Sequence, residues 1–96
     1  MIIELKKFGT TLTSRDSGHE AYRAMESALK GLKEDEEIVL NFEGVNTFSP
    51  SWGDEFIVTV VNNYKNKVIL LNTQNRSVVE TLKLLSEIGK IDFNFR

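Results

Sequence analysis

The chain of 96 residues contains no cysteine, one histidine and one proline. Without cysteine it can form no disulfide scaffold, thiol nucleophile or thiolate metal site, and the single His19 excludes a cluster of histidine ligands. No apolar run approaches the ~18 residues of a membrane-spanning helix, and the first charges are not ordered as in a secretory signal. We therefore expect a cytoplasmic protein that does not enter a membrane and needs no metal or cofactor.

The chain also lacks a large excess of charge of either sign. Its net charge is −2 and its isoelectric point is near 5.4, which is the wrong sign for a protein that must neutralise nucleic-acid phosphates. The length suits one domain spanning residues 1–96, with roughly 60–65% of the unfolded surface buried on folding. The composition, 41% hydrophobic, is that of an ordinary globular domain.

Apolar and β-branched residues are concentrated in segments that predict strands. Residues 38–42 and 67–71 are nearly continuous apolar runs, as in strands covered on both faces. Residues 1–8 mix apolar and charged side chains and predict an outer strand, followed by a turn or short strand at 9–11. Residues 91–95 alternate apolar and polar side chains, which predicts a half-buried strand near a sheet edge. Such an edge allows weak homodimerisation, so we expect a monomer or weak homodimer.

Apolar residues between these strands recur every three or four positions, which predicts three main helices. Pro50 suits the first position of the second helix, because its missing amide hydrogen has no partner there in any case. The expected bounds are Ser14 or Ser17 to about Leu32, with Gly31 near the end, Ser49 to about Tyr64, and Thr73 or Asn75 to Gly89. Strands and helices alternate, so right-handed crossovers predict an α/β fold with a mixed, mostly parallel sheet of four to five strands.

The residues that could carry chemistry do not form a catalytic set. Asp54 and Glu55 are adjacent in a helix, diverge by ~100° and are expected to complement the helix dipole. His19 has no obvious carboxylate partner other than Glu20, which points in a different direction. Ser51 lacks a nearby base and is not part of a Gly-x-Ser-x-Gly elbow. We therefore expect the protein not to be an enzyme.

The connection after the second core strand, residues 44–53, is the best candidate site. It lies at the carboxyl edge of the predicted sheet, where open α/β folds usually bind their ligands. In a structural interpretation Ser49 is the N-cap and Trp52 belongs to the core. In a functional interpretation the hydroxyl groups are exposed at a helix N-terminus, where an added phosphate would be favoured, and an exposed Trp52 would dominate an interface.

Two stretches of this region, residues 38–45 and 48–56, resemble a bacterial family of STAS-like domains of unknown function. Its members read roughly valine–leucine–aspartate–phenylalanine–x–glycine–valine, then serines, then aspartate–glutamate–leucine or phenylalanine. Asn41 stands here in place of the strand's aspartate, and Thr13-Ser14-Arg15 also looks like the family's first helix start. The likeness covers about residues 10–90.

STAS domains include the anti-sigma factor antagonists, so the resemblance implies a small βα superhelix and a non-enzymatic regulator that docks on a protein partner. That partner would be an anti-sigma factor or a histidine-kinase-like ATPase. In those antagonists the partner kinase phosphorylates a serine at the start of the second helix and turns off binding. Pro50 looks like the counterpart of that serine, which leaves Ser51 as the first candidate phospho-acceptor and Ser49 as the second. The expected partner-binding residues are Asn46, Thr47, Ser49, Ser51, Trp52, Asp54 and Glu55.

A different class of function uses the same loop. A small-ligand or nucleotide-binding domain would contact its ligand through Asn46, Thr47 and Ser49. The two hypotheses differ in shape: docking predicts an exposed patch at the loop, and ligand binding predicts a concave site there. A phosphotransferase or hydrolase fragment is the third alternative.

Overall fold

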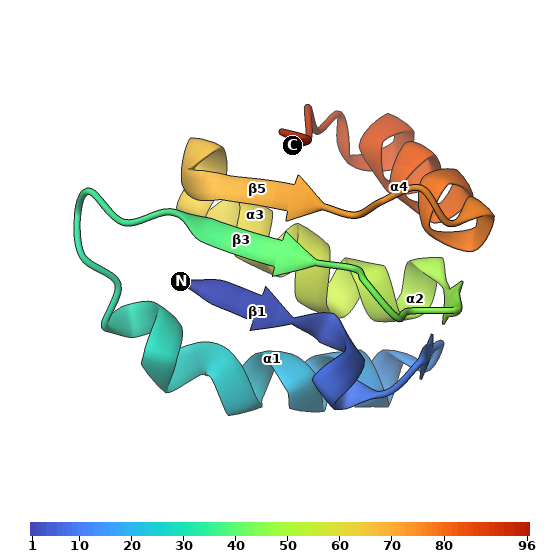
Figure 1. Ribbon diagram of the computed structural model, residues 1–96, viewed down its shortest axis with the longest axis horizontal. Coiled ribbons are helices and arrows are strands. Elements are labelled where there is room, and N and C mark those ends of the chain that lie inside the picture. Colours follow the sequence, from blue (N-terminus) through green and yellow to red (C-terminus); the bar gives the residue numbers. More distant parts are fainter.

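The structure, a computed structural model, describes all residues from 1 to 96. Its centre is a parallel sheet of three strands in the order β1-β3-β5, which comprise Ile2–Glu4, Ile38–Asn41 and Val68–Leu71 (Figure 1). A second parallel pair joins β2 (Thr11–Leu12) to β4 (Thr47–Phe48). The predicted α/β fold with a mostly parallel arrangement is confirmed, with the five strands divided between two sheets.

The helices follow the predicted order. The first is α1, Arg15–Lys30, and the last is α4, Arg76–Gly89. The middle helix is continuous in three parts, α2 (Pro50–Gly53), a π-helical stretch (Asp54–Val58) and α3 (Thr59–Tyr64). No helix combines the length and the apolar character that crossing a bilayer requires.

Side chains fix where two of these helices begin. The hydroxyl oxygen of Ser14 accepts a hydrogen bond from the amide of Ser17 at 3.0 Å, so α1 starts at the earlier of its two predicted caps. The amide oxygen of Asn75 accepts from the amides of Ser77 and Val78, at 2.8 and 3.3 Å, which selects Asn75 over Thr73 as the cap of α4.

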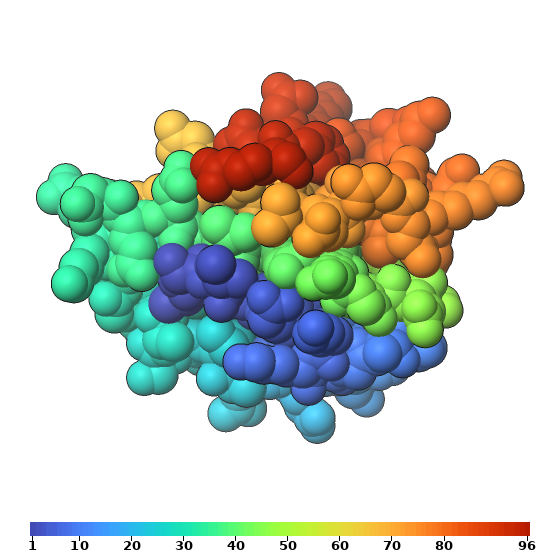
Figure 2. Space-filling model, viewed as in Figure 1, coloured from blue at the N-terminus to red at the C-terminus, as the bar shows by residue number.

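The structure departs from the predicted strands at both ends of the chain. Only residues 2–4 of the predicted outer strand are extended, and Leu5–Phe8 form a 3₁₀ turn that buries Leu5. Near the C-terminus, one bridge between Leu70 and Phe95 replaces the predicted strand. The amide of Leu70 donates to the carbonyl of Asn94 at 2.8 Å, and Figure 2 shows these last residues, in red, lying along the upper part of the face seen in Figure 1.

The core lies between the three-stranded sheet and the helices. Ile3, Leu40 and Leu70 are neighbours in the sheet register and form a buried row. In Figure 1 the helices pack behind and around the sheet, and none crosses in front of it. Ile2, which points away from that buried row, is consequently 64% exposed.

Candidate docking surface

The loop that leads from β3 to α2 is held on a rigid base. Gly44, with φ of +85°, makes the turn after the strand, in a conformation that only glycine adopts without strain. The amides of Asn46 and Thr47 both donate to the carbonyl of Thr10, at 2.8 and 3.1 Å. Phe48 then donates its amide to the hydroxyl oxygen of Ser77 at 2.9 Å, which ties β4 to the start of α4. The backbone of the loop therefore has a fixed position.

Polar side chains project from this base into solvent. Asn46 and Thr47 are exposed, and neither side chain makes a hydrogen bond within the protein. Thr11, the register partner of Thr47 in the small sheet, is exposed as well. Of the patch from Asn46 to Trp52 that the docking hypothesis expects, Asn46 and Thr47 have exposed side chains, while Phe48 and Trp52 are buried.

The two serines at the start of α2 differ in what they contact. Ser49 is the residue before the helix, as predicted, but its hydroxyl group donates to the carbonyl of Thr13 at 2.7 Å and does not cap the helix. Ser51 is half-buried and its hydroxyl group makes no hydrogen bond within the protein. Ser51 is therefore the less constrained of the two hydroxyl groups.

Trp52 is not an exposed contact residue, so its predicted place among the partner-binding residues is wrong. It is 0% exposed and stacks on Phe56, with ring centroids 5.0 Å apart and planes inclined by 24°. Phe48 and Phe8 also contact it, at 6.1 and 6.2 Å between centroids. The side chain fills the space between the middle helix and the N-terminal segment, and the structural interpretation of this residue holds.

Two glycines explain why Trp52 is sealed inside. A Cβ atom on Gly18 of α1 would lie 2.7 Å from the carbonyl oxygen of Trp52, so the backbones of α1 and α2 meet almost directly. A Cβ atom on Gly53 would lie 2.6 Å from a methyl carbon of Leu85 and 2.8 Å from the ring of Phe48. The absence of both side chains lets α1 and α4 pack directly against the turn of helix that carries Trp52.

An ion-pair cluster joins α1 to the same helix start. The guanidinium group of Arg15 donates to the carboxylates of Asp54 at 2.9 Å and Glu55 at 2.7 Å. These two hydrogen bonds raise the pKa of Arg15 above its usual value, and the bond to Asp54 has the larger effect. Asp54 is exposed and Glu55 is half-buried, so both predicted contact residues lie at the surface with a cation from α1 between them.

Sequence reasoning missed the part that α1 plays in this surface. His19 was expected to have no partner beyond Glu20, but its Nδ1 atom lies 3.4 Å from the carboxylate of Glu55. Arg15 and His19 are four residues apart and therefore share one face of the helix, opposite the acidic pair Asp54 and Glu55 that begins the π-helical stretch after α2. That spacing of opposite charges was a signal in the sequence that could have paired the two helices.

Neither of the two main pockets of the surface lies at the loop. The two main hollows have volumes of about 600 and 310 Å³ and are lined by residues from the second half of the chain, none of them between 44 and 56. No group of three or more acidic or histidine side chains is placed to hold a metal ion.

The comparisons with known proteins agree with this architecture. A family model described as a STAS-like domain of unknown function matches residues 23–77, more than half of the chain and including the whole loop. No curated protein and no solved structure matches the chain. With its parallel strands, its crossover helices and this match, the chain belongs to the family of STAS-like domains of unknown function.

Proposed function

We propose that this STAS-like domain is a non-enzymatic regulatory module that docks on a protein partner through the loop and helix start at residues 44–56. The partner class that the family resemblance suggests is a histidine-kinase-like ATPase or an anti-sigma factor. The contact residues are Asn46, Thr47, Ser49, Ser51, Asp54 and Glu55, with Trp52 removed from the set that the sequence suggested.

The observation that carries this proposal is the contrast between a fixed backbone and free side chains at the loop. Thr10 holds the backbone at Asn46 and Thr47, while the side chains of these two residues remain exposed and unpaired. A backbone that is already fixed loses little conformational freedom when a partner binds, which favours a specific complex. Neither of the two main hollows is lined by residues of this loop, which supports docking over the small-ligand alternative.

The electrostatics of the helix start support a docking role over a catalytic one. Both Asp54 and Glu55 accept hydrogen bonds from Arg15, so the guanidinium group already occupies an oxygen of each carboxylate. A carboxylate that is held in this way has little freedom to reach a substrate as a general acid or base. Its charge still reaches the surface, where it can orient a charged partner.

A phosphate on Ser51 would act on the same charges. Ser51 precedes Asp54 by three residues and Glu55 by four, which places all three on one face of the helix. A dianion there would repel both carboxylates and compete with them for Arg15. We infer that phosphorylation of Ser51 switches off docking by adding about two negative charges to a face on which two carboxylates already outnumber one guanidinium group.

The docking surface can be tested by site-specific photo-crosslinking in cells. A photoreactive amino acid replaces Thr47 in one variant and the exposed Ala28 of α1 in a control. We expect a discrete crosslink from position 47 to an ATPase of the histidine-kinase superfamily or to an anti-sigma factor, and none from position 28. Equal crosslinking from both positions, or none from position 47, would contradict the proposal.

The switch is tested with the same crosslink and a pair of acidic substitutions. Ser51→Asp should reduce the crosslink from position 47 about tenfold, the effect of losing roughly 1.4 kcal/mol of binding energy. Ser27→Asp adds the same charge to the exposed surface of α1 and should leave the crosslink unchanged. An equal response to the two substitutions would show that net charge, and not the position of Ser51, controls binding.

A further inference from the structure

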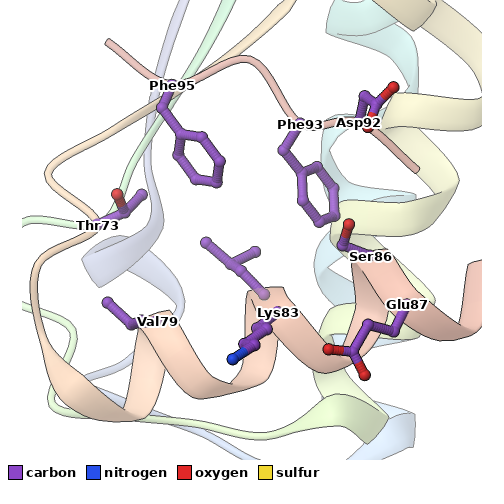
Figure 3. Close-up of a pocket in the computed structure, with 9 residues that line it drawn as sticks. Thr73, Val79, Lys83, Ser86, Glu87, Asp92, Phe93 and Phe95 are labelled. Atoms are coloured by element: carbon purple, nitrogen blue, oxygen red, sulfur yellow. The ribbon is translucent and has the colours of Figure 1, made fainter. Parts of the chain in front are cut away.

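The larger hollow of the molecule lies away from the proposed docking loop, between α4 and the C-terminal segment. Its volume is about 600 Å³, inside the ~300–1,000 Å³ range of small-molecule sites. Figure 3 shows α4 along one side and the rings of Phe93 and Phe95 facing it from the other. The residues that line the hollow are Thr73, Val79, Leu82, Lys83, Ser86, Glu87, Asp92, Phe93 and Phe95.

One part of the hollow is apolar and incompletely covered. Phe93 and Phe95 contact each other edge to face, with ring centroids 6.3 Å apart and planes inclined by 70°. Phe95 is 59% exposed and Val79, across the hollow on α4, is 46% exposed. A flat apolar group placed among these three side chains would remove aromatic and aliphatic surface from water, which favours binding.

The charges of the hollow are separated along its length. Lys83 lies between Val79 and Glu87 on α4, and Asp92 lies beside Phe93 at the same end as Glu87 (Figure 3). None of the three charged side chains forms an ion pair in the structure. The hydroxyl group of Ser86 is already used, because it donates to the carbonyl of Ile91 at 2.6 Å. The available polar groups are therefore one ammonium, two carboxylates and the hydroxyl group of Thr73.

These charges discriminate among ligand classes. A simple organic anion would pair with Lys83 but would be repelled by Glu87 and Asp92. A simple organic cation would pair with one of these carboxylates but would be repelled by Lys83. A molecule that carries both charges next to an apolar body opposes neither. We propose that this hollow binds a small amphipathic zwitterion, an α-amino acid with an aromatic side chain, with its carboxylate toward Lys83, its ammonium toward Glu87, which lies one helical turn further along α4, and its ring against Phe95.

The proposal is tested with four probes that share a phenyl ring and differ in charge. These are phenylalanine (zwitterion), phenethylamine (cation), 3-phenylpropionate (anion) and 3-phenylpropanol (neutral), each titrated into the isotopically labelled full chain while amide shifts are recorded by NMR. We expect phenylalanine to bind tightest, by about threefold or more over each of the others, the effect of one partly exposed ion pair. The shifts should be concentrated at residues 73, 79–87 and 92–95.

Two substitutions separate the roles of the charges. Lys83→Met should weaken phenylalanine and 3-phenylpropionate about threefold and leave phenethylamine bound as well or better. Glu87→Gln should weaken phenylalanine and phenethylamine about threefold and spare 3-phenylpropionate. Lys30→Met, which removes an exposed lysine of α1 outside the hollow, is the matched control and should change none of the affinities.

Several results would overturn the proposal. Equal affinity for the four probes would show that only the apolar surface matters, and tightest binding of the cation or the anion would assign the hollow to that class. Shifts scattered over the surface, or none with any probe, would remove the site altogether.

Discussion

Two regions of the molecule differ in how tightly they are packed. One is the crossing of α1 with α2, and the other is the hollow between α4 and residues 91–96, which forms a groove along α4. At the crossing, the missing side chain of Gly18 lets backbone meet backbone, and Trp52 is 0% exposed. At the groove, Phe95 remains 59% exposed beside a hollow of about 600 Å³. One aromatic ring is fully enclosed, and the other has water on much of its surface.

The difference teaches where each kind of recognition is possible. A backbone in a fixed position that carries exposed polar side chains suits a protein partner at the loop of residues 44–56. A groove with unfilled apolar space suits a small molecule that completes the packing. The same domain can therefore offer two sites whose physical requirements differ.

The largest expected effect is the loss of Trp52. Trp52→Ala should lower the free energy of unfolding by about 3–5 kcal/mol, because a large ring is removed from a closed core. Phe95→Ala, at the exposed ring of the groove, should cost less than about 1 kcal/mol. Urea denaturation followed by circular dichroism measures both.

These two variants also bear on how an interaction assay is interpreted. Because Trp52 is a core residue, a variant there that fails to bind a partner reports on the stability of the fold and not on a lost contact, so Thr47 and Ser51 are the informative positions for docking. Similar destabilisation by Trp52→Ala and Phe95→Ala would contradict the contrast between the crossing and the groove.

A smaller effect is expected from a methyl group at the crossing. Gly18→Ala should destabilise the protein by about 1–3 kcal/mol, because the new Cβ would collide with the backbone at Trp52. Gly31→Ala is the matched change at the end of α1, where a Cβ would make only ordinary contacts and the backbone φ of −85° suits alanine. This control should be neutral or stabilising by about 0.4–1 kcal/mol. Denaturation midpoints in urea that move equally for both variants would show that the crossing is not tightly packed.

The smallest effect lies outside both regions, at Glu36. Its side chain accepts a hydrogen bond from the amide of Lys33 at 3.2 Å, which lowers the pKa of this carboxyl from its ordinary value of 4.5. A lowered pKa in the folded state stabilises the protein at pH values above 4.5, and this contribution is lost as the pH falls through the folded value. Glu36→Gln should therefore lower the melting temperature slightly at pH 7 and have progressively less effect in acid. A difference that does not depend on pH would exclude the carboxylate as its cause.

The order of elements was predictable from the sequence because it depends on local patterns. Apolar periodicity placed the helices, Pro50 marked the start of the middle one, and Ser14 and Asn75 were among the predicted caps. Features that depend on distant contacts were not predictable. Phe56 and Ile57 are both fully buried in the π-helical stretch at residues 54–58, and no local sequence pattern indicates that the helix is a π-helix there.

The candidate site was predictable in place but not in detail. The loop after β3 was singled out because parallel strands end there, and its exposed Asn46 and Thr47 agree with that expectation. Whether Trp52 faced water depended on Gly18, more than thirty residues earlier in the chain, so two interpretations stayed open until the helices were placed. The groove was missed for the same reason, because residues 91–95 pair with β5 only at the bridge between Leu70 and Phe95, and the ring of Phe95 stays 59% exposed.

The parallel pairing of the central sheet has a consequence for how the protein is made. Ile2 pairs with Val39, and Val39 with Ile69, so neither strand pair can be joined by a short hairpin. On a ribosome, β1 emerges early and has no partner in this sheet until β3 has left the exit tunnel. Such long sequence separations slow folding, and β1, with its exposed Ile2, is the segment of the nascent chain that stays unprotected longest.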